Sequence, residues 1–204
     1  MKLKKLESIA FIPDGNRRYS KKSGLSLAES YSLGTKKAYQ IIDWLHDFNE
    51  IKTGSFYTLS KENLSRSCLE LNALFRLFEK ELIRIEKENF FSDRDIKLKF
   101  VGSINLLPKK LQLLMKSAEE KTIDNKGKLI NLCIAYNGQQ EIVDACKSIA
   151  LKAKENAFDL SKLSVDSFSD FLYNSFKFPD LIVRTSGIER LSGFLTFQSA
   201  YSEF

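Results

Sequence analysis

Ser8-Ile-Ala-Phe-Ile-Pro-Asp-Gly-Asn-Arg-Arg-Tyr-Ser20 joins an apolar run to a turn that is rich in charge. Pro13 cannot donate a hydrogen bond to a sheet, and the Asp-Gly-Asn after it consists of residue types that favour turns and helix N-caps. The sequence therefore predicts a strand over residues 8–12 that ends at the N-terminus of a helix. Such an N-terminus has free N–H groups and the positive end of a helix dipole, so it favours a phosphate group.

Asp14 is unexpected beside an anion site, because its carboxylate repels a phosphate unless a divalent cation lies between them. We therefore interpret the turn as a diphosphate site linked by Mg²⁺, with Arg17 and Arg18 as further cations. An ordinary surface turn is the alternative for this stretch alone. The chain lacks both common glycine motifs for phosphates, G-x-x-x-x-G-K-[ST] and G-x-G-x-x-G.

Strand-like runs alternate with amphipathic helical patterns along the rest of the chain. We predict strands over residues 53–59, 96–101, 128–135 and 180–183, and helices over residues 34–49, 69–91, 108–122, 140–154 and 165–175. The helix over residues 69–91 carries a long apolar stripe on one face. The alternation predicts one α/β domain over residues 1–204, with a mainly parallel sheet covered by helices on both faces.

Polar residues follow several of these strands, over residues 14–18, 60–66, 136–139 and 184–192. In parallel sheets ligands bind outside the carboxyl ends of the strands, so we expect these segments to meet at one edge of the sheet. Five arginines, three carboxylates and several hydroxyl groups would gather there. The sequence therefore predicts a functional anion site at this edge.

Composition places the chain among soluble globular proteins: 204 residues, 43% hydrophobic and 28% charged. The apolar runs are far shorter than the roughly 18 residues that span a bilayer, and no export signal is evident, so we expect a cytoplasmic protein. Cys68, Cys133 and Cys146 are read as reduced core thiols, and His46 as a surface or boundary residue. The widely separated cysteines and the single histidine disfavour a zinc site or a histidine-dependent triad.

The net charge of +6 suits phosphorylated substrates, an anionic membrane surface or nucleic acid. Nucleic acid is the least favoured partner, because the basic residues form no block of five and no aromatic-interleaved RNA-binding signature.

Several short motifs resemble those of the cis-prenyltransferase family, in the same order and over most of the chain. The motifs are Asp14-Gly-Asn-Arg-Arg18, Ser60-Lys-Glu-Asn63 with Arg66, Arg184-Thr-Ser-Gly187, Arg190-Leu-Ser192 and Ala200-Tyr-Ser-Glu203. The resemblance implies a dimeric α/β enzyme with a hydrophobic tunnel beside the helix over residues 69–91. Its Mg²⁺-dependent activity condenses isopentenyl diphosphate repeatedly onto farnesyl diphosphate. The product would be an undecaprenyl-type diphosphate for cell-wall glycan synthesis, delivered at the membrane surface, which implies a peripheral association.

The same resemblance assigns roles to individual residues. Asp14 would bind Mg²⁺ and assist departure of the allylic diphosphate, and Glu203 would be a second Mg²⁺ contact. Asn63 would position the isopentenyl unit or accept its proton, with Ser60 and Arg66 in support. Arg184, Arg190 and Ser192 would hold isopentenyl diphosphate. The remaining motif residues assigned to substrate binding are Gly15, Asn16, Arg17, Arg18, Tyr19, Lys61, Glu62 and Leu191.

Some positions depart from the family pattern. Leu27 and Tyr31 replace a usual arginine and histidine, Leu64 replaces an aromatic residue, Ile188 replaces a glutamate and Gly193 an asparagine. Some phosphate contacts are therefore expected to be missing. The family also continues beyond Phe204 with a strand and further helices.

Two other functions remain open. A non-catalytic partner subunit of a cis-prenyltransferase would keep the fold without turnover, although it would not need the retained Asp14, Asn63 and Arg184. A nucleic-acid or generic anion binder rests on the charge alone.

Overall fold

Five strands form one sheet in the order β3–β4–β2–β1–β5, and every neighbouring pair is parallel. The structure is a computed structural model that describes residues 5–173 and 177–204. The strands are β1 (Ser8–Ile12), β2 (Thr53–Ser60), β3 (Ile96–Val101), β4 (Lys128–Tyr136) and β5 (Leu181–Arg184). Each lies within one or two residues of its predicted position, and the single α/β domain with a parallel sheet is confirmed.

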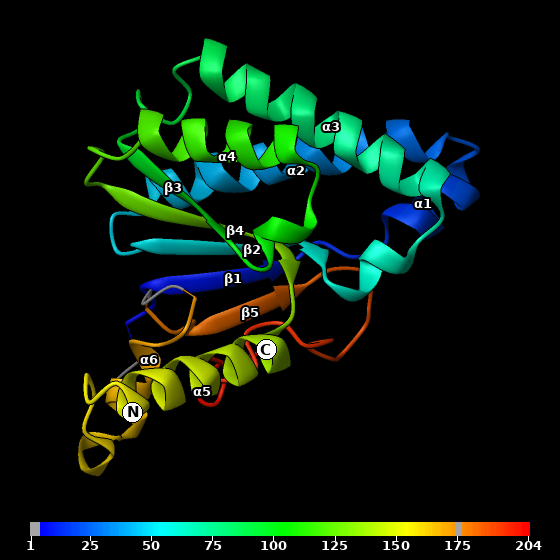
Figure 1. The fold of residues 1–204 in the computed structure, drawn as a ribbon. Coiled ribbons are helices and arrows are strands. Elements are labelled where there is room, and N and C mark those ends of the chain that lie inside the picture. The colour runs from blue at the N-terminus through cyan, green and yellow to red at the C-terminus, as the bar shows by residue number, and fades with distance from the viewer. Residues whose placement is uncertain (1–4, 174–176) are drawn as a thin grey trace.

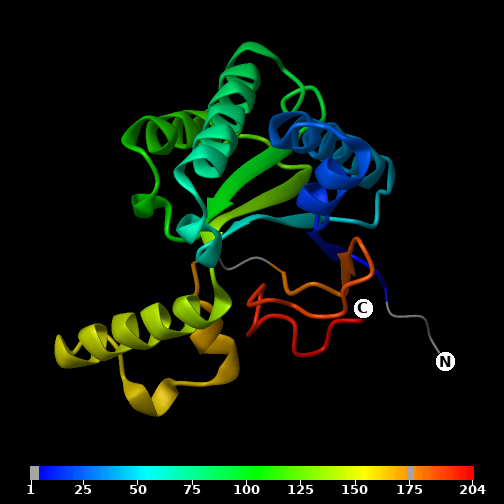
Figure 2. The same cartoon turned by 90° about the vertical axis from the view of Figure 1, so that its right-hand side faces the viewer.

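Helices cover both faces of this sheet (Figure 1). Helices α2 (Leu27–Asp47), α3 (Cys68–Lys87) and α4 (Lys109–Lys121) lie on one face. Helices α5 (Gly138–Lys154) and α6 (Val165–Ser169) lie on the other, where Figure 2 separates them clearly from the first group. The short α1 (Asn16–Ser23) lies beyond the carboxyl end of β1. Three 3₁₀ turns complete the described elements: η1 (Glu62–Ser65), η2 (Ile104–Leu106) and η3 (Leu160–Lys162).

Each face of the sheet has its own apolar cluster. The larger cluster joins α2, α3 and α4 to the sheet and contains Ile42, Leu82 and Met115 among its buried members. The smaller one lies on the α5 side and contains Tyr136 and Phe194. Because both faces are buried, β1 and β4 have nearly continuous apolar sequences, as is typical of parallel strands, whereas the buried β2 also contains glycine and small hydroxyl residues.

The helix predicted over residues 34–49 begins earlier than expected, at Leu27. Ser26 caps it by accepting a hydrogen bond from the backbone N–H of Glu29, and the Glu29 side chain accepts one from the N–H of Ser26. This capping box fixes the helix start seven residues before the predicted one. Helix α3 ends at Lys87 rather than at residue 91. Helix α6 ends at Ser169, and the last two residues of the helix predicted over 165–175 lie outside the described residues.

The expectation of three core thiols was only partly right. Cys133 on β4 is fully buried, whereas Cys68 and Cys146 are exposed on helices. His46 is half-buried, as expected for a boundary residue. Among the described helices, none combines the length and the apolar character that crossing a membrane requires.

Candidate active site

The turn after β1 is held against the turn after β5 by paired hydrogen bonds. The backbone N–H of Asp14 donates to Thr185 Oγ1 at 2.9 Å, and that hydroxyl donates to the Asp14 carbonyl at 2.7 Å. Gly15 is the N-cap of α1 with φ +106°, and a Cβ placed on it would lie 2.9 Å from Cβ of Ser186. Only glycine fits both this backbone conformation and this close approach. The two turns therefore bring the start of α1 beside the end of β5.

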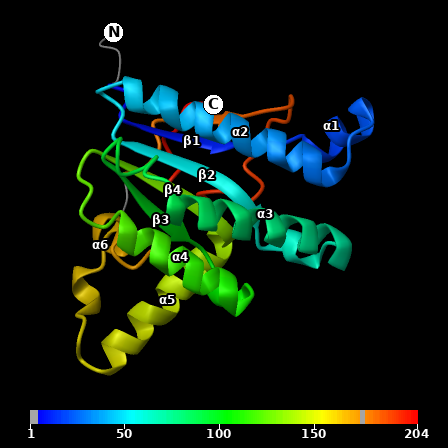
Figure 3. The same cartoon turned by 90° about the horizontal axis from the view of Figure 1, so that it is seen from above.

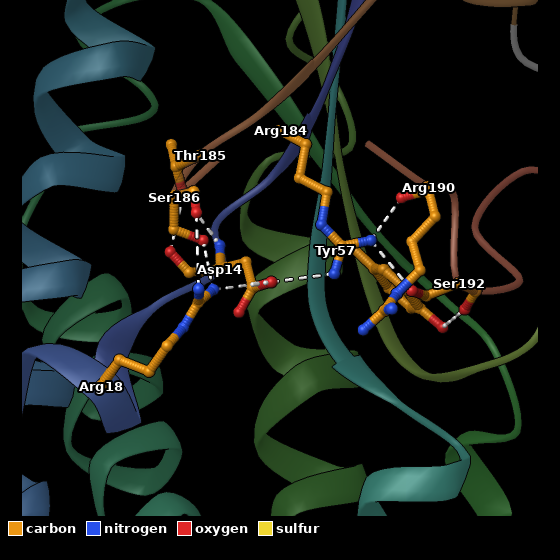
Figure 4. Close-up of polar contacts among 8 residues, drawn as sticks. All are labelled: Asp14, Arg18, Tyr57, Arg184, Thr185, Ser186, Arg190 and Ser192. Carbon is orange, nitrogen blue, oxygen red and sulfur yellow. Dashed lines mark hydrogen bonds and ion pairs between the residues drawn. The ribbon is translucent and has the colours of Figure 1, made fainter. Parts of the chain in front are cut away.

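Asp14 lies between two arginines at this junction (Figure 4). Its Oδ2 accepts a hydrogen bond from Arg184 at 2.8 Å and lies 3.4 Å from NH2 of Arg18. Partial burial alone would raise the pKa of Asp14, but the Arg184 hydrogen bond, the Gly15 N–H and the charge of Arg18 together lower it below 3.8. The carboxylate is therefore ionised at neutral pH.

Arg184 is held from several sides. Its NH1 donates to the carbonyl of Arg190 and to Ser192 Oγ, the latter at 2.9 Å, while NH2 donates to Asp14. Its side chain is only 12% exposed, and its buried Nε has no acceptor among the described residues. A buried N–H without an acceptor is costly, so this group is suited to a ligand oxygen.

A second polar cluster links α2 and α3 at the same edge. Glu70 Oε1 accepts hydrogen bonds from Tyr31 at 2.7 Å and from Arg66 at 2.9 Å, and Arg17 Nε lies 3.6 Å away. Arg66 also donates to the Tyr31 hydroxyl at 3.2 Å. Burial and the Glu70 carboxylate raise the pKa of Tyr31 to about 12, so the hydroxyl remains a donor. The cluster fixes the orientation of two arginines.

These groups open into one large cavity of about 660 Å³. The polar lining residues at its mouth come from the ends of the strands, the turns that follow them, α1 and α2: Asp14, Gly15, Asn16, Arg17, Arg18, Lys21, Tyr31, Ser60, Asn63, Arg66, Arg184, Arg190 and Ser192. The rest of the lining is mainly apolar and comes from α2, α3, α4 and the sheet face beneath them. Leu74, Phe78, Leu82, Phe100 and Met115 are examples. The cavity thus has a charged mouth and an apolar interior.

A second cavity of about 550 Å³ adjoins the mouth. Its lining includes Glu62, Asn137 and Leu191, and it shares Ser60, Asn63 and Ser192 with the main cavity. These three shared residues therefore form part of the wall between the two cavities.

Most of the residues predicted for the site meet at these two cavities, but three do not. Tyr19 is half exposed on α1 and lines neither cavity. Lys61 also lines neither, and its ammonium donates to Gln140 Oε1 at 2.6 Å. The third is Glu203.

The structure separates Glu203 from Asp14, the other predicted Mg²⁺ ligand. The backbone of Glu203 bonds to Asp180 and Ile182 at the start of β5. Asp14 contacts Arg184 at the end of that strand, roughly 10 Å further at about 3.3 Å per residue. Within one chain the two segments therefore lie at opposite ends of β5, because the segment carrying Glu203 pairs with the start of that strand. The role of Glu203 as a second Mg²⁺ contact stays a prediction.

Asp14 is the carboxylate that fits a metal at the mouth. Among the described residues no group of three or more His, Cys, Asp or Glu side chains is placed to hold an ion. Mg²⁺ commonly uses one or two protein carboxylates together with substrate phosphates and water. The ionised Asp14 beside a cationic cavity fits that arrangement, in which a diphosphate supplies the other oxygens.

Sequence reasoning missed the contribution of Glu70. The stripe of α3 was read for its apolar residues only, although Arg66 and Glu70 have the i, i+4 spacing of a helical ion pair. Tyr31 was read as a lost phosphate contact, yet it lines the cavity and orients Arg66. Leu27 packs against the larger core cluster and lines neither cavity.

Comparison with known proteins gives consistent matches across the chain. A family model described as "Putative undecaprenyl diphosphate synthase" matches residues 12–204. A protein of Methanocaldococcus jannaschii named tritrans,polycis-undecaprenyl-diphosphate synthase (geranylgeranyl-diphosphate specific) is 38% identical, covering 96% of this chain and 70% of its own. Isoprenyl transferase 1 of Corynebacterium glutamicum is 36% identical over 93% of this chain and 85% of its own.

A solved structure is similar in three dimensions. The lavandulyl diphosphate synthase of Lavandula x intermedia, in complex with dimethylallyl diphosphate, superposes with a TM-score of 0.91 and 32% sequence identity. The match covers 98% of this chain and 86% of the plant protein.

Proposed function

The chain belongs to the undecaprenyl diphosphate synthase family of cis-prenyltransferases, and we propose that it joins isopentenyl diphosphate to an allylic diphosphate in the main cavity. One observation carries the proposal: a cluster of arginines with an ionised carboxylate opens into an apolar interior. The charged mouth suits a diphosphate, and the interior suits a prenyl tail.

In the reaction the allylic carbon–oxygen bond breaks and diphosphate leaves. A bond forms between that carbon and the terminal alkene carbon of isopentenyl diphosphate, and one proton is lost. Charge accumulates on the departing diphosphate, where Arg17, Arg18 and the N–H groups of α1 can stabilise it. Because these groups are held in place before the substrate binds, they need little reorganisation during the reaction.

Isopentenyl diphosphate would bind on the other side of the mouth. Arg184, Arg190 and Ser192 form a hydrogen-bonded group there, and the unpaired Nε of Arg184 is available to a phosphate oxygen. Asn63 lines both cavities, and η1 fixes it through a hydrogen bond from its N–H to Ser60 Oγ. We assign Asn63 the positioning of the isopentenyl unit where its proton is lost.

Mg²⁺ is the proposed cofactor, held by Asp14 together with diphosphate oxygens. A bound Mg²⁺ neutralises charge on the leaving diphosphate. Both arginines contact Oδ2 of Asp14, so a metal bound at this oxygen would replace one Asp14–arginine contact. Arg18 is the more exposed of the two arginines and has the longer contact.

Farnesyl diphosphate is the proposed acceptor, and an undecaprenyl-type diphosphate is the product expected from the sequence, formed by a homodimer and delivered at the membrane. The names of the relatives widen the set of acceptors to be tested: the archaeal protein is named as geranylgeranyl-specific, and the plant structure holds dimethylallyl diphosphate.

The test is incubation of the chain with Mg²⁺, labelled isopentenyl diphosphate and each of the three acceptors. We expect labelled apolar product that depends on the acceptor and disappears when the metal is chelated. Acceptor binding without product, at several protein concentrations, would instead favour the partner-subunit function. Absence of both would overturn the proposal.

A further inference from the structure

A carboxylate lies inside the apolar part of the main cavity. Glu81 on α3 lines this cavity with a side chain that is 19% exposed. Its Oε2 is buried and accepts no hydrogen bond from any described residue. Arg84 NH1 is 3.8 Å away, too far for a hydrogen bond, and Arg84 Nε donates to Glu88 instead at 2.8 Å. The Glu81 carboxylate therefore lacks a hydrogen-bond donor for one of its two oxygens among the described residues.

Tyr39 faces this carboxylate from α2, which packs against α3 (Figure 3). Its ring also lines the cavity, and the Arg84 guanidinium carbon lies 4.8 Å from the ring centroid. The ring packs edge-on against Phe90, with centroids 5.0 Å apart. Burial raises the pKa of Tyr39, and the charge of Glu81 and a side-chain hydrogen bond to Glu81 raise it further, so Tyr39 is a partner of this carboxylate while Oε2 has none among the described residues. We call Tyr39, Glu81 and Arg84 the seam cluster, because they join α2 and α3 across the cavity.

The seam cluster lies about one farnesyl tail away from the mouth. Glu81 follows Glu70 by eleven residues on the same helix, or roughly 16 Å along the axis at about 1.5 Å per residue. An isoprene unit has four chain bonds of about 1.5 Å and extends roughly 4–5 Å, so three units span about 14 Å. The tail of a fifteen-carbon acceptor thus reaches the region of Glu81 before any elongation.

The cavity volume also indicates room for about one farnesyl diphosphate. A cavity of about 150 Å³ holds benzene, which corresponds to about 25 Å³ for each non-hydrogen atom. At that density the 660 Å³ cavity holds about 26 such atoms, close to the roughly 24 of farnesyl diphosphate. An undecaprenyl diphosphate has about 64 and needs more than twice this volume. Elongation therefore has to move the tail past the seam cluster.

We propose that Glu81 is a product-length-determining residue, whose carboxylate in the seam cluster resists passage of the growing tail between α2 and α3. This inference rests on the proposed function. A hydrocarbon tail that covers a carboxylate removes its remaining water without supplying a hydrogen bond, which is unfavourable. Each condensation beyond the first pushes the tail further over Glu81, so elongation ends after few additions. The inference therefore replaces the undecaprenyl-type product expected from the sequence by a shorter one.

The test is the product ladder of the wild type, Glu81→Leu and Glu81→Gln with farnesyl diphosphate, separated by chain length after removal of the diphosphate. We expect Glu81→Leu to lengthen the main product by about two units, since roughly 9 Å of α3 remains beyond Glu81. Glu81→Gln should give an intermediate shift. Glu86→Leu is the matched control, because Glu86 is exposed on the same helix and lines neither cavity.

An unchanged ladder in Glu81→Leu, with thermal stability equal to that of the control, would overturn the inference. If the wild type forms no product, the proposed function fails, and the inference is then tested by binding. Farnesyl diphosphate and a diphosphate with a tail of about seven units serve as probes. We expect Glu81→Leu to improve the affinity ratio for the longer probe about tenfold over wild type and Glu86→Leu. An equal ratio in all three proteins would contradict the role of Glu81.

Discussion

The two ends of the main cavity each carry a tyrosine from α2 and a glutamate from α3, in different surroundings. At the mouth, Glu70 accepts hydrogen bonds from Tyr31 and Arg66, and Arg17 adds a second cation. In the interior, Glu81 has Tyr39 and a distant Arg84 but an oxygen that accepts no hydrogen bond from the described residues. Glu70, with its hydrogen bonds satisfied, can orient the arginines beside it, whereas Glu81, with one oxygen lacking a hydrogen bond, is proposed to act on the prenyl tail that enters the cavity.

The largest loss of turnover is expected from a substitution at the mouth of the cavity. Asp14→Asn removes the charge that can hold the metal, so we expect turnover to fall by at least about two orders of magnitude. Asp166→Asn is the control, since this carboxylate is exposed on α6 and lines neither cavity. Steady-state kinetics at saturating Mg²⁺ measure the loss. Normal turnover in Asp14→Asn would show that Asp14 holds no metal that the reaction needs. The proposed difference between the charged mouth and the interior would then fail.

The next effect concerns the mouth cluster alone. Glu70→Gln weakens the hydrogen bonds that orient Arg66 and Arg17, and a charge-assisted bond contributes about 1.5–3 kcal/mol. We expect the Michaelis constant for the allylic diphosphate to rise about tenfold, with a smaller change in kcat. Tyr31→Phe should give a weaker form of the same effect, because Arg66 still bonds directly to Glu70. A fall in kcat alone, without a change in the constant for either substrate, would show that Glu70 does not act through substrate binding.

A smaller effect is expected where the cavity wall is purely apolar. Phe78 lines the interior, and Phe78→Ala enlarges it without changing any charge. We expect the product ladder to extend by about one unit, less than for Glu81→Leu, together with a loss of stability of about 3 kcal/mol. Chromatography of the products and thermal unfolding measure the two effects. A loss of stability with an unaltered ladder would assign Phe78 to packing alone.

The smallest effect is a pH dependence of stability at the mouth. The pKa of Asp14 in the folded chain lies below 3.8, mainly because Arg184 and the Gly15 N–H outweigh burial. The stabilisation by its ionised form is therefore fully present above about pH 4 and is lost as the pH falls through the folded pKa. Urea unfolding of wild type and Asp14→Asn at pH 7 and pH 3 measures it. We expect the difference between the two proteins to shrink at pH 3, and a constant difference would contradict the Asp14–Arg184 pairing.

The contrast between the ends also shows what the sequence could and could not predict. The five strands were predictable because apolar runs end at polar turns, and parallel topology then places residues 14–18 beside residues 184–192. The early start of α2 was also predictable, because Ser26 and Glu29 have the spacing of a capping box. The apolar periodicity alone did not reveal it.

Other features depend on tertiary contacts. The pairing of Tyr31 with Glu70 joins two helices across 39 positions, and no local pattern specifies it. Glu81 follows Glu79 and Lys80 in a polar stretch, although it lies three residues after Phe78 and four before Ile85, which is the spacing of the apolar stripe of α3. The sequence alone does not show that this face of α3 borders a cavity. Glu203 is assigned to the metal by motif resemblance alone, and the pairing of its segment with the start of β5, away from Asp14, follows from tertiary contacts that no local pattern specifies.

The most direct measurement is a crystal structure of this chain with Mg²⁺ and a farnesyl thiolodiphosphate, which cannot ionise readily. The account predicts diphosphate oxygens within hydrogen-bond distance of Arg18 and the N–H groups of α1, a metal on Asp14, and the end of the tail against Tyr39 and Glu81. A diphosphate bound in the second cavity, or a tail that leaves the mouth toward solvent, would contradict it.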